Sequence, residues 1–426
     1  MKRKIRMKVL WFVPVRNYYS QYSHDYNGGG WITSLENIIS KRDEVELSIA
    51  FYDTIGQHDK IRNCTTTYYP MPSQKQSTIA KIWQSFRPLN IQAEQKILDT
   101  QKVAKKVIED YKPDIIQIFG TESALGIVSE ITDTPCVIHL QGILSACMNA
   151  WLPPFFSWRE YFHQSFHPRR LKYILGEKLS WNRNVLIENQ IFKKCQNFIG
   201  RTAWDKRVTA ILNPYAAYYH CDEILRESFY KTDERKLPEK PIFVSTISYM
   251  LYKGYDLILK TAKILKEYTD LPFEWLVYGN VNPEFVEKKL GIRHANVNVR
   301  LMGVASPEKL KEELLNATAY VHPSYIENSS NAIGEAQILG LTTVCCHVGG
   351  LSTLVENDKT GFLVPTNHPY ELAYILKHIF ENPELNTRIG TAAQIEALER
   401  HNPQRICDAL IGIYKKIIAS HHDSKE

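Results

Sequence analysis

The chain has 426 residues, of which 44% are hydrophobic and 23% charged, and it carries a formal net charge of +6. This length exceeds one ordinary hydrophobic core and predicts two domains or three. No stretch reaches the roughly 18 uninterrupted apolar residues that a membrane-spanning helix needs. The mild positive charge by itself excludes neither a nucleic acid nor a membrane surface as a partner.

The N-terminal residues MKRKIRMKVLWFVPV begin with basic side chains, as a secretory signal does. The apolar run that follows is short and stops at Pro14 and Arg16, so we expect a first β-strand and no signal peptide. The eight cysteines lie scattered, without a C-x-x-C pair. Their spacing favours reduced thiols in a cytoplasm and predicts no metal site.

Strand-like apolar runs alternate with helical patterns along the whole chain. In the first half, strands are expected at residues 7–13, 45–51, 114–120, 135–140 and in a short run that ends at Gly200. In the second half they are expected at residues 241–248, 273–279, 297–303, 319–324 and 342–347. Helical stretches intervene, among them residues 97–111, 256–268 and 307–316. Such alternation indicates parallel sheets that are covered on both faces.

Two such blocks predict an α/β protein with two Rossmann-like, doubly wound domains. The first is expected to span residues 1–230 and the second residues 241–403, joined by a polar linker at residues 231–240. A last helical stretch follows Pro403, and we expect residues 404–426 to cross back to the first domain. Ligands of doubly wound sheets bind beyond the carboxyl ends of the strands. The cleft between the two domains is therefore the expected site.

Two glutamates flank a polar turn in the second block, within HPSYIENSSNAIGEAQILG. A strand precedes Glu327, and a helix that Ser330 is suited to cap follows it. The amide groups near Ser330, Asn331 and Ala332 are expected to form an anion site at the helix N-terminus. Glu335, about one turn further on, is placed to accept hydrogen bonds from a diol. These features fit a nucleotide sugar; the alternative is that both glutamates are ordinary solvated acids.

This stretch resembles the E-x7-E signature of retaining glycosyltransferases with the GT-B fold, in particular glycosyltransferase family 4. The upstream YKGYDLILKTAKIL resembles the family's K-G-x-D helix start, and the downstream TTVCCHVGGLSTLVENDKTGFLV resembles its strand, glycine pair and G-F-L-V strand. The resemblance covers nearly all of the C-terminal domain. The N-terminal domain resembles the family more loosely, through the glycines at residues 28–30 and the strand end VIHLQG. It implies two Rossmann-like domains that face each other across a cleft.

The resemblance also implies roles for individual residues. Lys253 would face the donor diphosphate, and with Glu327 and His139 it forms the expected catalytic set. His139 would bond the donor sugar near its reacting centre; its alternative is a buried core histidine. The expected nucleotide-sugar-binding set comprises Gly29, Gly30, Arg201, Ser248, Lys253, Glu327, Ser330, Asn331, Ala332 and Glu335.

The chain departs from the family pattern at Ser248. The family usually has an arginine there, which also contacts the diphosphate, so one cationic partner is missing from its expected place. Arg201 follows a predicted strand of the N-terminal domain and is the candidate to supply the lost charge. The alternative is a structural arginine that caps the end of its strand.

No D-x-D pair occurs in the chain. Glycosyltransferases of the other main fold use that pair to hold a divalent metal on the diphosphate. We therefore expect a metal-independent site without a cofactor, where a lysine and helix N-termini neutralise the leaving diphosphate. The reaction that the resemblance implies is sugar transfer, with retention, from a UDP- or GDP-sugar. A P-loop and a G-x-S-x-G elbow are absent, and no nucleic-acid partner is expected.

Residues 151–173, WLPPFFSWREYFHQSFHPRRLKY, mix bulky aromatic with basic side chains. They could lie at a membrane interface or line a pocket for a lipid-linked acceptor, or they could pack internally. The first interpretation suits a cytoplasmic enzyme at the inner face of the membrane that transfers sugar to a glycan or lipid-linked saccharide in bacterial surface polysaccharide synthesis. The alternatives are an epimerase or glycan phosphorylase of the same fold, and a catalytically silent nucleotide-sugar-binding subunit of a polysaccharide assembly.

Overall fold

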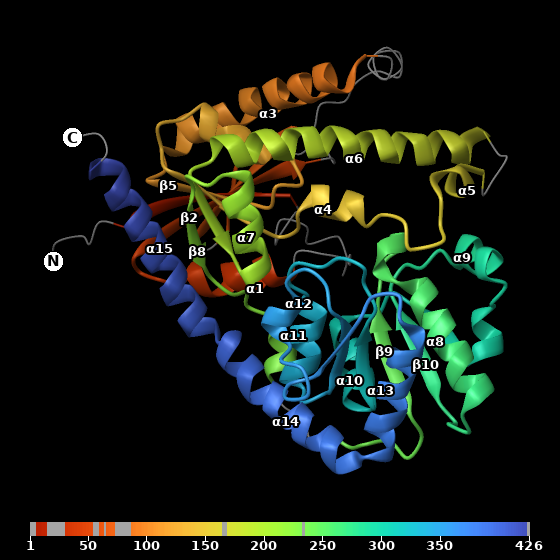
Figure 1. Ribbon diagram of the computed structural model, residues 1–426. Helices are drawn as coiled ribbons and strands as arrows, with labels where there is room; N and C mark the ends of the chain where they lie inside the picture. Colours follow the sequence, from red (N-terminus) through yellow and green to blue (C-terminus); the bar gives the residue numbers. More distant parts are fainter. Residues whose placement is uncertain are drawn as a thin grey trace.

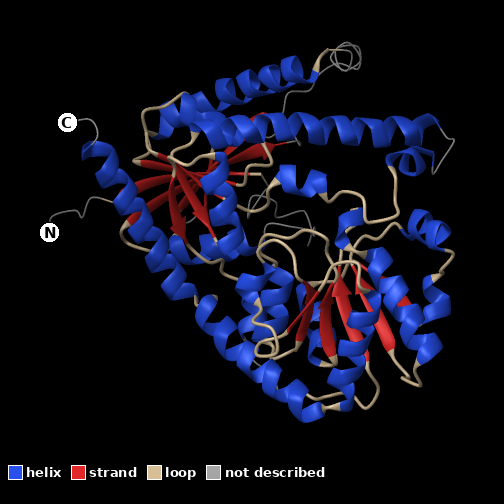
Figure 2. Ribbon diagram, viewed as in Figure 1, coloured by secondary structure: helices blue, strands red, loops and turns tan. Residues whose placement is uncertain are grey.

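The computed structural model describes residues 6–14, 30–53, 59–63, 65–72, 87–163, 168–231 and 235–423. The chain forms two α/β domains, each built on its own sheet (Figures 1 and 2). A cavity is lined by residues of both domains. The predicted fold class, two doubly wound domains, is confirmed. Within the described ranges, no helix is both long enough and apolar enough to cross a bilayer.

The N-terminal sheet has the strand order β3-β4-β2-β1-β5-β6-β7-β8, and all neighbours are parallel except β3 and β4. Its strands are β1 (Met7–Val13), β2 (Val45–Asp53), β3 (Ile61–Asn63), β4 (Thr66–Pro72), β5 (Ile115–Phe119), β6 (Cys136–His139), β7 (Asn197–Gly200) and β8 (Ala217–His220). The apolar pattern misses β3, β4 and β8. They lie toward the two edges of the sheet, where continuous apolar runs are not required.

Alternate residues of β1 show how this sheet is covered on both faces. Leu10 and Phe12 pack toward α3 and α6, whereas Val9, Trp11 and Val13 pack toward α1 and α15. This period of two is the geometry of a strand, and burial on both sides explains why the strand reads as one apolar run. The helices of this domain are α1 (Gly30–Ile39), α3 (Leu89–Tyr111), α4 (Leu144–Asn149), α5 (Trp158–His163), α6 (Pro168–Lys194) and α7 (Ala203–Leu212), with the short turn η1 (Ala124–Glu130).

The C-terminal sheet is parallel throughout its described strands, in the order β11-β10-β9-β12-β13-β14. Its strands are β9 (Ile242–Thr246), β10 (Glu274–Tyr278), β11 (Val299–Gly303), β12 (Ala319–His322), β13 (Thr343–Cys346) and β14 (Phe362–Val364). The strand order reverses between β9 and β12. Ligands of doubly wound sheets bind at this point.

The helices of the C-terminal domain follow strong start signals in the sequence. Proline stands at the first or second helical position of α9, α10, α13 and α14, where its missing N–H removes no helical hydrogen bond. The helices and short turns are η3 (Leu251–Lys253), α8 (Tyr255–Tyr268), α9 (Pro283–Leu290), η4 (His294–Val297), α10 (Pro307–Leu315), α11 (Asn331–Ile338), α12 (Leu351–Leu354), α13 (Pro369–Glu381) and α14 (Pro383–Arg400).

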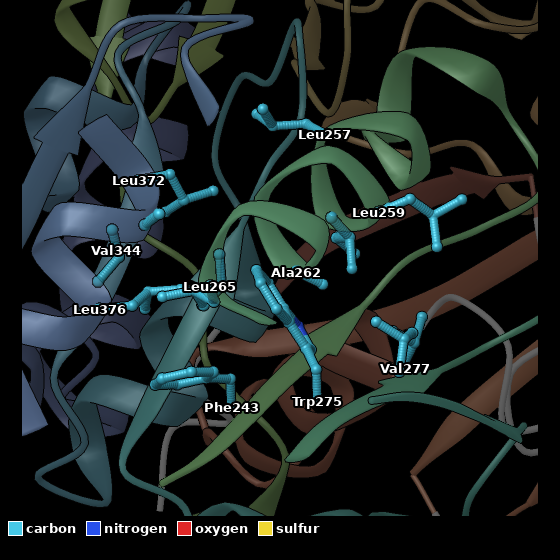
Figure 3. Close-up of a cluster of buried hydrophobic side chains, with 14 of the residues drawn as sticks. Phe243, Leu257, Leu259, Ala262, Leu265, Trp275, Val277, Val344, Leu372 and Leu376 are labelled. Carbon is cyan, nitrogen blue, oxygen red and sulfur yellow. The ribbon is translucent and has the colours of Figure 1, made fainter. Parts of the chain in front are cut away.

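The main core of this domain lies between the sheet and helices α8 and α13 (Figure 3). Trp275 is fully buried against Phe243 and the leucines of α8. Its indole N–H donates to Ser245 Oγ at 3.0 Å, and that hydroxyl donates to the Val321 carbonyl at 2.8 Å. The core therefore ties β10, β9 and β12 together directly beneath the strand ends that carry the site.

The chain crosses twice between the domains. Helix α15 (Pro403–Asp423) leaves the C-terminal domain after α14 and packs on the N-terminal sheet (Figure 1). There Trp11 Nε1 donates to Tyr414 Oη at 3.0 Å, and the Tyr414 hydroxyl donates to Gln117. These contacts place residues 403–423 on the N-terminal domain.

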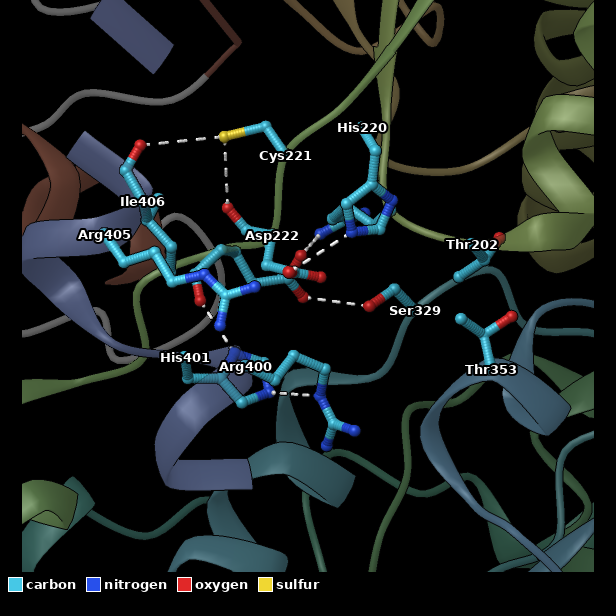
Figure 4. Close-up of polar contacts among 12 residues, drawn as sticks. Thr202, His220, Cys221, Asp222, Ser329, Thr353, Arg400, His401, Arg405 and Ile406 are labelled. Atoms are coloured by element: carbon cyan, nitrogen blue, oxygen red, sulfur yellow. Dashed lines mark hydrogen bonds and ion pairs between the residues drawn. The ribbon is translucent and has the colours of Figure 1, made fainter. Parts of the chain in front are cut away.

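The other crossing precedes the predicted linker at residues 231–240. Leu225 and Phe229 are already buried among side chains of the C-terminal domain, and Phe229 belongs to the turn η2 (Glu227–Tyr230). Figure 4 shows the two crossings side by side, with His401 Nδ1 2.7 Å from the Glu223 carbonyl. The chain therefore already contacts the C-terminal domain at residues 225–229, before the predicted linker, and the segment at residues 221–226 connects the two domains.

Candidate functional site

A cavity of about 660 Å³ separates the two domains at the carboxyl ends of both sheets. This is the volume range of small-molecule sites, and its position is the one expected for doubly wound domains. The N-terminal domain contributes Gly30, Glu122, Gly142 and Arg201 to its lining, and the segment at residues 221–226 that connects the domains, here called the connector, contributes Arg226. The C-terminal domain contributes Ser248, Lys253, Gly279, His322, Glu327, Ser330, Asn331, Ala332 and Glu335.

Glu327 lies between Lys253 and His322, and one of its oxygens is within hydrogen-bond distance of both side chains. Lys253 Nζ lies 2.7 Å and His322 Nε2 3.0 Å from Glu327 Oε2. Burial alone would raise the pKa of Glu327, but the neighbouring Lys253 and His322 override it and lower the pKa to about 2. Glu327 is therefore a carboxylate at any pH near neutrality.

A glycine brings Lys253 to this position. Gly254 has φ +81°, and a Cβ on it would lie 2.1 Å from the Pro323 carbonyl oxygen. Tyr325 N donates to the Tyr252 carbonyl at 2.7 Å, which joins the same two loops. The K-G pair therefore allows the loop after β9 to pack on the loop after β12, because a side chain at residue 254 would separate them.

The glycine pair at residues 349 and 350 packs against the backbone of the loop that carries Glu327. A Cβ on Gly349, which has φ +51°, would lie 1.9 Å from the Glu327 carbonyl oxygen. Gly350 N donates to that same oxygen at 3.0 Å. Both positions need glycine because backbone packs directly on backbone here. This contact fixes the position of the Glu327 backbone at the edge of the cavity.

The N-terminus of α11 opens into the cavity. Ser330 is its N-cap, and its carbonyl accepts from the amides of Ile333 and Gly334 at 3.1 and 3.2 Å. The earlier amides, at Asn331 and Ala332, have no carbonyl within the helix to bond, and both residues line the cavity. The Ser330 side chain makes no capping bond, so these amides are available to an anion.

Glu335 lies one turn into α11 and is clasped by an arginine from the connector. Arg226 Nε and Nη2 each lie 2.6 Å from one oxygen of the Glu335 carboxylate. Burial raises the pKa of Glu335, and Arg226 opposes that shift. Sequence spacing gives no signal for Arg226, because only the fold brings residue 226 beside residue 335.

The N-terminal wall holds the other predicted residues. Gly30 begins α1 and lines the cavity, whereas Gly29 lies outside the described residues. Arg201 also lines the cavity, but it forms a buried ion pair with Glu223 and donates to the Gln141 carbonyl at 2.9 Å. Arg201 follows β7 and faces the cavity, as predicted, but Glu223 already balances the charge of its guanidinium.

Two acidic residues at or behind this wall escape sequence reasoning: Glu122 lines the cavity, and Glu188 is buried behind it. Glu122 follows β5 and accepts from Gly142 N at 2.9 Å; burial raises its pKa to about 7. Glu188, on α6, accepts from the amides of Leu144 and Ser145 at 2.8 and 2.9 Å and so anchors the start of α4. The position of Glu122 just beyond a strand end is the one sequence signal that could have found it.

His139 is fully buried and is not among the described residues that line the cavity, as its alternative expects, and its catalytic role stays a prediction. It is the last residue of β6, and its ring packs against Trp31 and Phe119 on the face covered by α1 and α15. Gln117 Nε2 lies 3.2 Å from its Nδ1, and burial holds its pKa well below the usual value. The alternation of side chains along β6 turns residue 139 into the core, so its alternative, a buried histidine, describes it.

The first residue of the segment at residues 151–173, Trp151, is packed inside the protein. The Trp151 ring lies 4.8 Å from Trp181 and 6.5 Å from Tyr252, so it bridges the two domains. Phe155 and Tyr173, in contrast, are 78% and 65% exposed. The first part of the segment thus supports the packing interpretation, and its exposed aromatics leave the membrane interpretation open to test.

Clusters of three or more histidine, cysteine, aspartate or glutamate side chains suited to a metal ion do not occur in the described ranges. Metal independence of the reaction stays a prediction, because a metal can also arrive with a diphosphate substrate.

Two Rossmann-like domains with a ligand-sized cavity between their strand ends define the GT-B fold, and solved structures agree. Sucrose-phosphate synthase from Thermosynechococcus elongatus superposes with a TM-score of 0.70 over 97% of this chain and 100% of that chain, at 14% identity. The Anabaena protein HepE in complex with UDP and glucose superposes with a TM-score of 0.65 over 96% and 100%, at 16% identity. Such identities establish a shared fold and leave the activity open.

The sequence comparisons match part of the chain, mainly in the C-terminal half. Residues 227–396 match the family model of glycosyl transferases group 1, so the resemblance stated from the sequence is confirmed over this part of the chain. A D-inositol 3-phosphate glycosyltransferase of Streptomyces coelicolor is 30% identical over 200 residues, 43% of each chain. An alpha-D-kanosaminyltransferase of Streptomyces kanamyceticus is 25% identical over 42% of this chain and 47% of its own. The matched part spans less than half the length of these relatives.

Proposed function

We propose that this protein is a retaining glycosyltransferase that moves a sugar from a nucleoside diphosphate sugar to a hydroxyl acceptor. The observation that carries the proposal is the arrangement of Lys253, Glu327 and Glu335 around the open N-terminus of α11 in one interdomain cavity. A cation and free amides suit a diphosphate, and a carboxylate one turn away suits a ribose. Relatives named as glycosyltransferases, and a structural neighbour in complex with UDP and glucose, support the same ligand class.

In this proposal, the leaving diphosphate is the group that the site stabilises. Negative charge grows on the diphosphate as the bond to the sugar breaks, and Lys253 with the amides of Asn331 and Ala332 would lower the energy of that charge. The donor is a UDP- or GDP-sugar, and neither a resident metal nor a cofactor takes part. The diphosphate itself takes the proton of the acceptor hydroxyl.

Glu327 has a positioning role in this scheme. Its oxygen is shared between Lys253 and His322, so it is a poor candidate for a covalent nucleophile. As a permanent anion it can accept hydrogen bonds from the hydroxyls of the donor sugar and hold Lys253 toward the diphosphate. Retention then follows from attack on the face that the diphosphate leaves, with the acceptor held by the opposite wall.

The acceptor side belongs to the N-terminal domain in this proposal. Glu122 and Gly142 line that wall, and a glycan or a lipid-linked saccharide is the proposed acceptor, in bacterial surface polysaccharide synthesis. Exposed apolar side chains on one stripe of α6 support peripheral contact with the inner face of the membrane; they are Leu171, Leu175, Leu179 and Leu186. Lys172 on the same helix would add attraction to anionic lipid.

A thermal-shift screen with UDP, GDP and ADP tests donor binding first. A ligand at about 100 times its Kd should stabilise the protein by about 2.7 kcal/mol. Turnover of the matching nucleotide sugar is then followed by NMR, with and without EDTA, and the anomeric configuration of the product is read directly. An inverted product contradicts retention, and loss of activity with EDTA contradicts metal independence. Binding without turnover on any acceptor indicates the silent binding subunit instead.

A further inference from the structure

Each lysine and arginine that lines the cavity in the described chain is already paired with a carboxylate. Lys253 pairs with Glu327, Arg201 with Glu223 and Arg226 with Glu335. Among the described residues, a diphosphate that enters this cavity meets no cation whose charge is unbalanced. Strong binding of the diphosphate therefore requires that at least one of these cations changes its partner.

The three pairs differ in how easily they can separate. The side chains of Arg201 and Glu223 are 4% and 1% exposed, and Arg201 also donates to a backbone carbonyl, so this pair is locked. Lys253 and Arg226 are both 23% exposed. Of these two, Arg226 holds both oxygens of a carboxylate that has no other described side chain as partner.

Arg226 also lies where a diphosphate would pass. Its Cγ and Cδ lie 3.3 and 3.4 Å from the position that a Cβ on Gly30 would take, so the side chain runs across the start of α1. Its guanidinium ends on Glu335, one turn into α11. The arginine thus spans two helix N-termini, and both ends favour an anion.

The partner that Arg226 occupies is the carboxylate proposed to bind ribose. Two ribose hydroxyls can donate to the two Glu335 oxygens, which replaces the two hydrogen bonds that Arg226 makes now. The ribose and Arg226 therefore compete for one carboxylate. An arginine released from Glu335 carries an unbalanced charge beside the diphosphate.

We infer that Arg226 is a donor-binding residue that exchanges Glu335 for the diphosphate when the nucleotide binds. The ribose hydroxyls take Glu335, and the guanidinium turns to the phosphate oxygens. Arg226 then supplies from the connector the cation that is missing at Ser248. This inference rests on the proposed function, because it takes a nucleoside diphosphate as the ligand.

The test compares a nucleoside with its diphosphate on the full-length protein by isothermal titration calorimetry. Uridine and UDP, guanosine and GDP, and adenosine and ADP are titrated into the wild type to find the pair that binds. With that pair, Arg226→Gln should weaken diphosphate binding at least about tenfold, or about 1.4 kcal/mol. The same variant should bind the nucleoside more tightly, because Glu335 no longer has to be released first.

Three further variants sharpen the result. Arg226→Lys keeps the charge without the planar fork, so it should recover part of the diphosphate affinity. In the Glu335→Gln background, Arg226→Gln should no longer improve nucleoside binding, since the competition is gone. Arg42→Gln is the control, because the Arg42 side chain is also ion-paired, is 25% exposed against 23% for Arg226, and does not line the cavity. This variant should leave both affinities unchanged. Thermal midpoints verify that each variant is folded.

The outcomes separate the inference from the proposed function. If the wild type binds a diphosphate and Arg226→Gln changes both affinities equally or not at all, Arg226 is structural and the inference is overturned, while the proposed function stands. If the wild type binds none of the three diphosphates, the proposed function itself fails.

Discussion

The two walls of the cavity take their residues from different kinds of segments. This difference explains why most site residues of the C-terminal wall could be predicted from the sequence and some of the N-terminal wall could not. The C-terminal wall takes Lys253, Glu327 and Glu335 from the segments that follow β9 and β12, the neighbouring strands of one switch point; Glu335 lies in α11. The N-terminal wall takes Glu122, Gly142 and Arg201 from the ends of three different strands. Lys253 on the first wall is 23% exposed, whereas Arg201 on the second is 4% exposed and held in a buried ion pair. Substitutions should therefore damage chemistry on one wall and stability on the other.

The largest effect is expected for Arg201→Ala, as lost stability. It leaves Glu223 buried without its charge partner, and breaking a buried pair in this way costs about 3–5 kcal/mol. The paired change Arg201→Met with Glu223→Gln should restore most of the loss, because no unpaired charge remains. Chemical denaturation with far-UV CD measures both. A stable Arg201→Ala variant with lost donor binding would instead make Arg201 a ligand of the diphosphate.

Lys253→Ala should lower kcat/KM for the donor by about tenfold to a hundredfold while the thermal midpoint changes little. Charge-assisted hydrogen bonds contribute about 1.5–3 kcal/mol, and about 1.4 kcal/mol is a factor of ten in rate. Lys263→Ala, on the exposed face of α8, is the matched control and should behave as wild type. Equal activity of both variants would contradict the assignment of Lys253.

Gly349→Ala should affect stability and chemistry together, by about 1–3 kcal/mol, because the residue has positive φ and its Cβ would meet the Glu327 carbonyl. Gly176→Ala is the control: it lies in α6, nothing lies within 4 Å of its added Cβ, and alanine should stabilise a helix by up to about 1 kcal/mol. Thermal midpoints and donor Kd values give the comparison. An active, stable Gly349→Ala variant would show that the Glu327 loop can shift freely.

The last prediction is a pH dependence on the N-terminal wall. Burial raises the pKa of Glu122 from 4.5 to about 7, so the folded protein keeps a proton that the unfolded chain loses. Stability from this group is fully present below pH 4.5 and is lost as the pH rises through 7. Relative to wild type, Glu122→Gln should therefore become more stable between about pH 5 and about pH 8. A constant difference in thermal midpoint across this range would contradict the raised pKa.

The sequence by itself determined much of the C-terminal domain. Its strands are continuous apolar runs, its helices open on prolines and a K-G pair, and its two glutamates flank a turn before a helix. These signals are local, because backbone geometry couples residues only a few positions apart. The glycine pair at residues 349 and 350 is recognised through the resemblance to glycosyltransferase family 4, and its contact with the Glu327 carbonyl appears only in the structure.

Only the tertiary structure decided what each charged residue contacts. Arg226 and Glu335 are 109 positions apart, and Arg201 and Glu223 are 22 positions apart, with α7 and β8 between them. The fate of His139 likewise depends on which face of β6 the core helices cover. Electrostatic pairing acts through space, and burial is set by packing between distant elements. No periodicity along the chain encodes either of them.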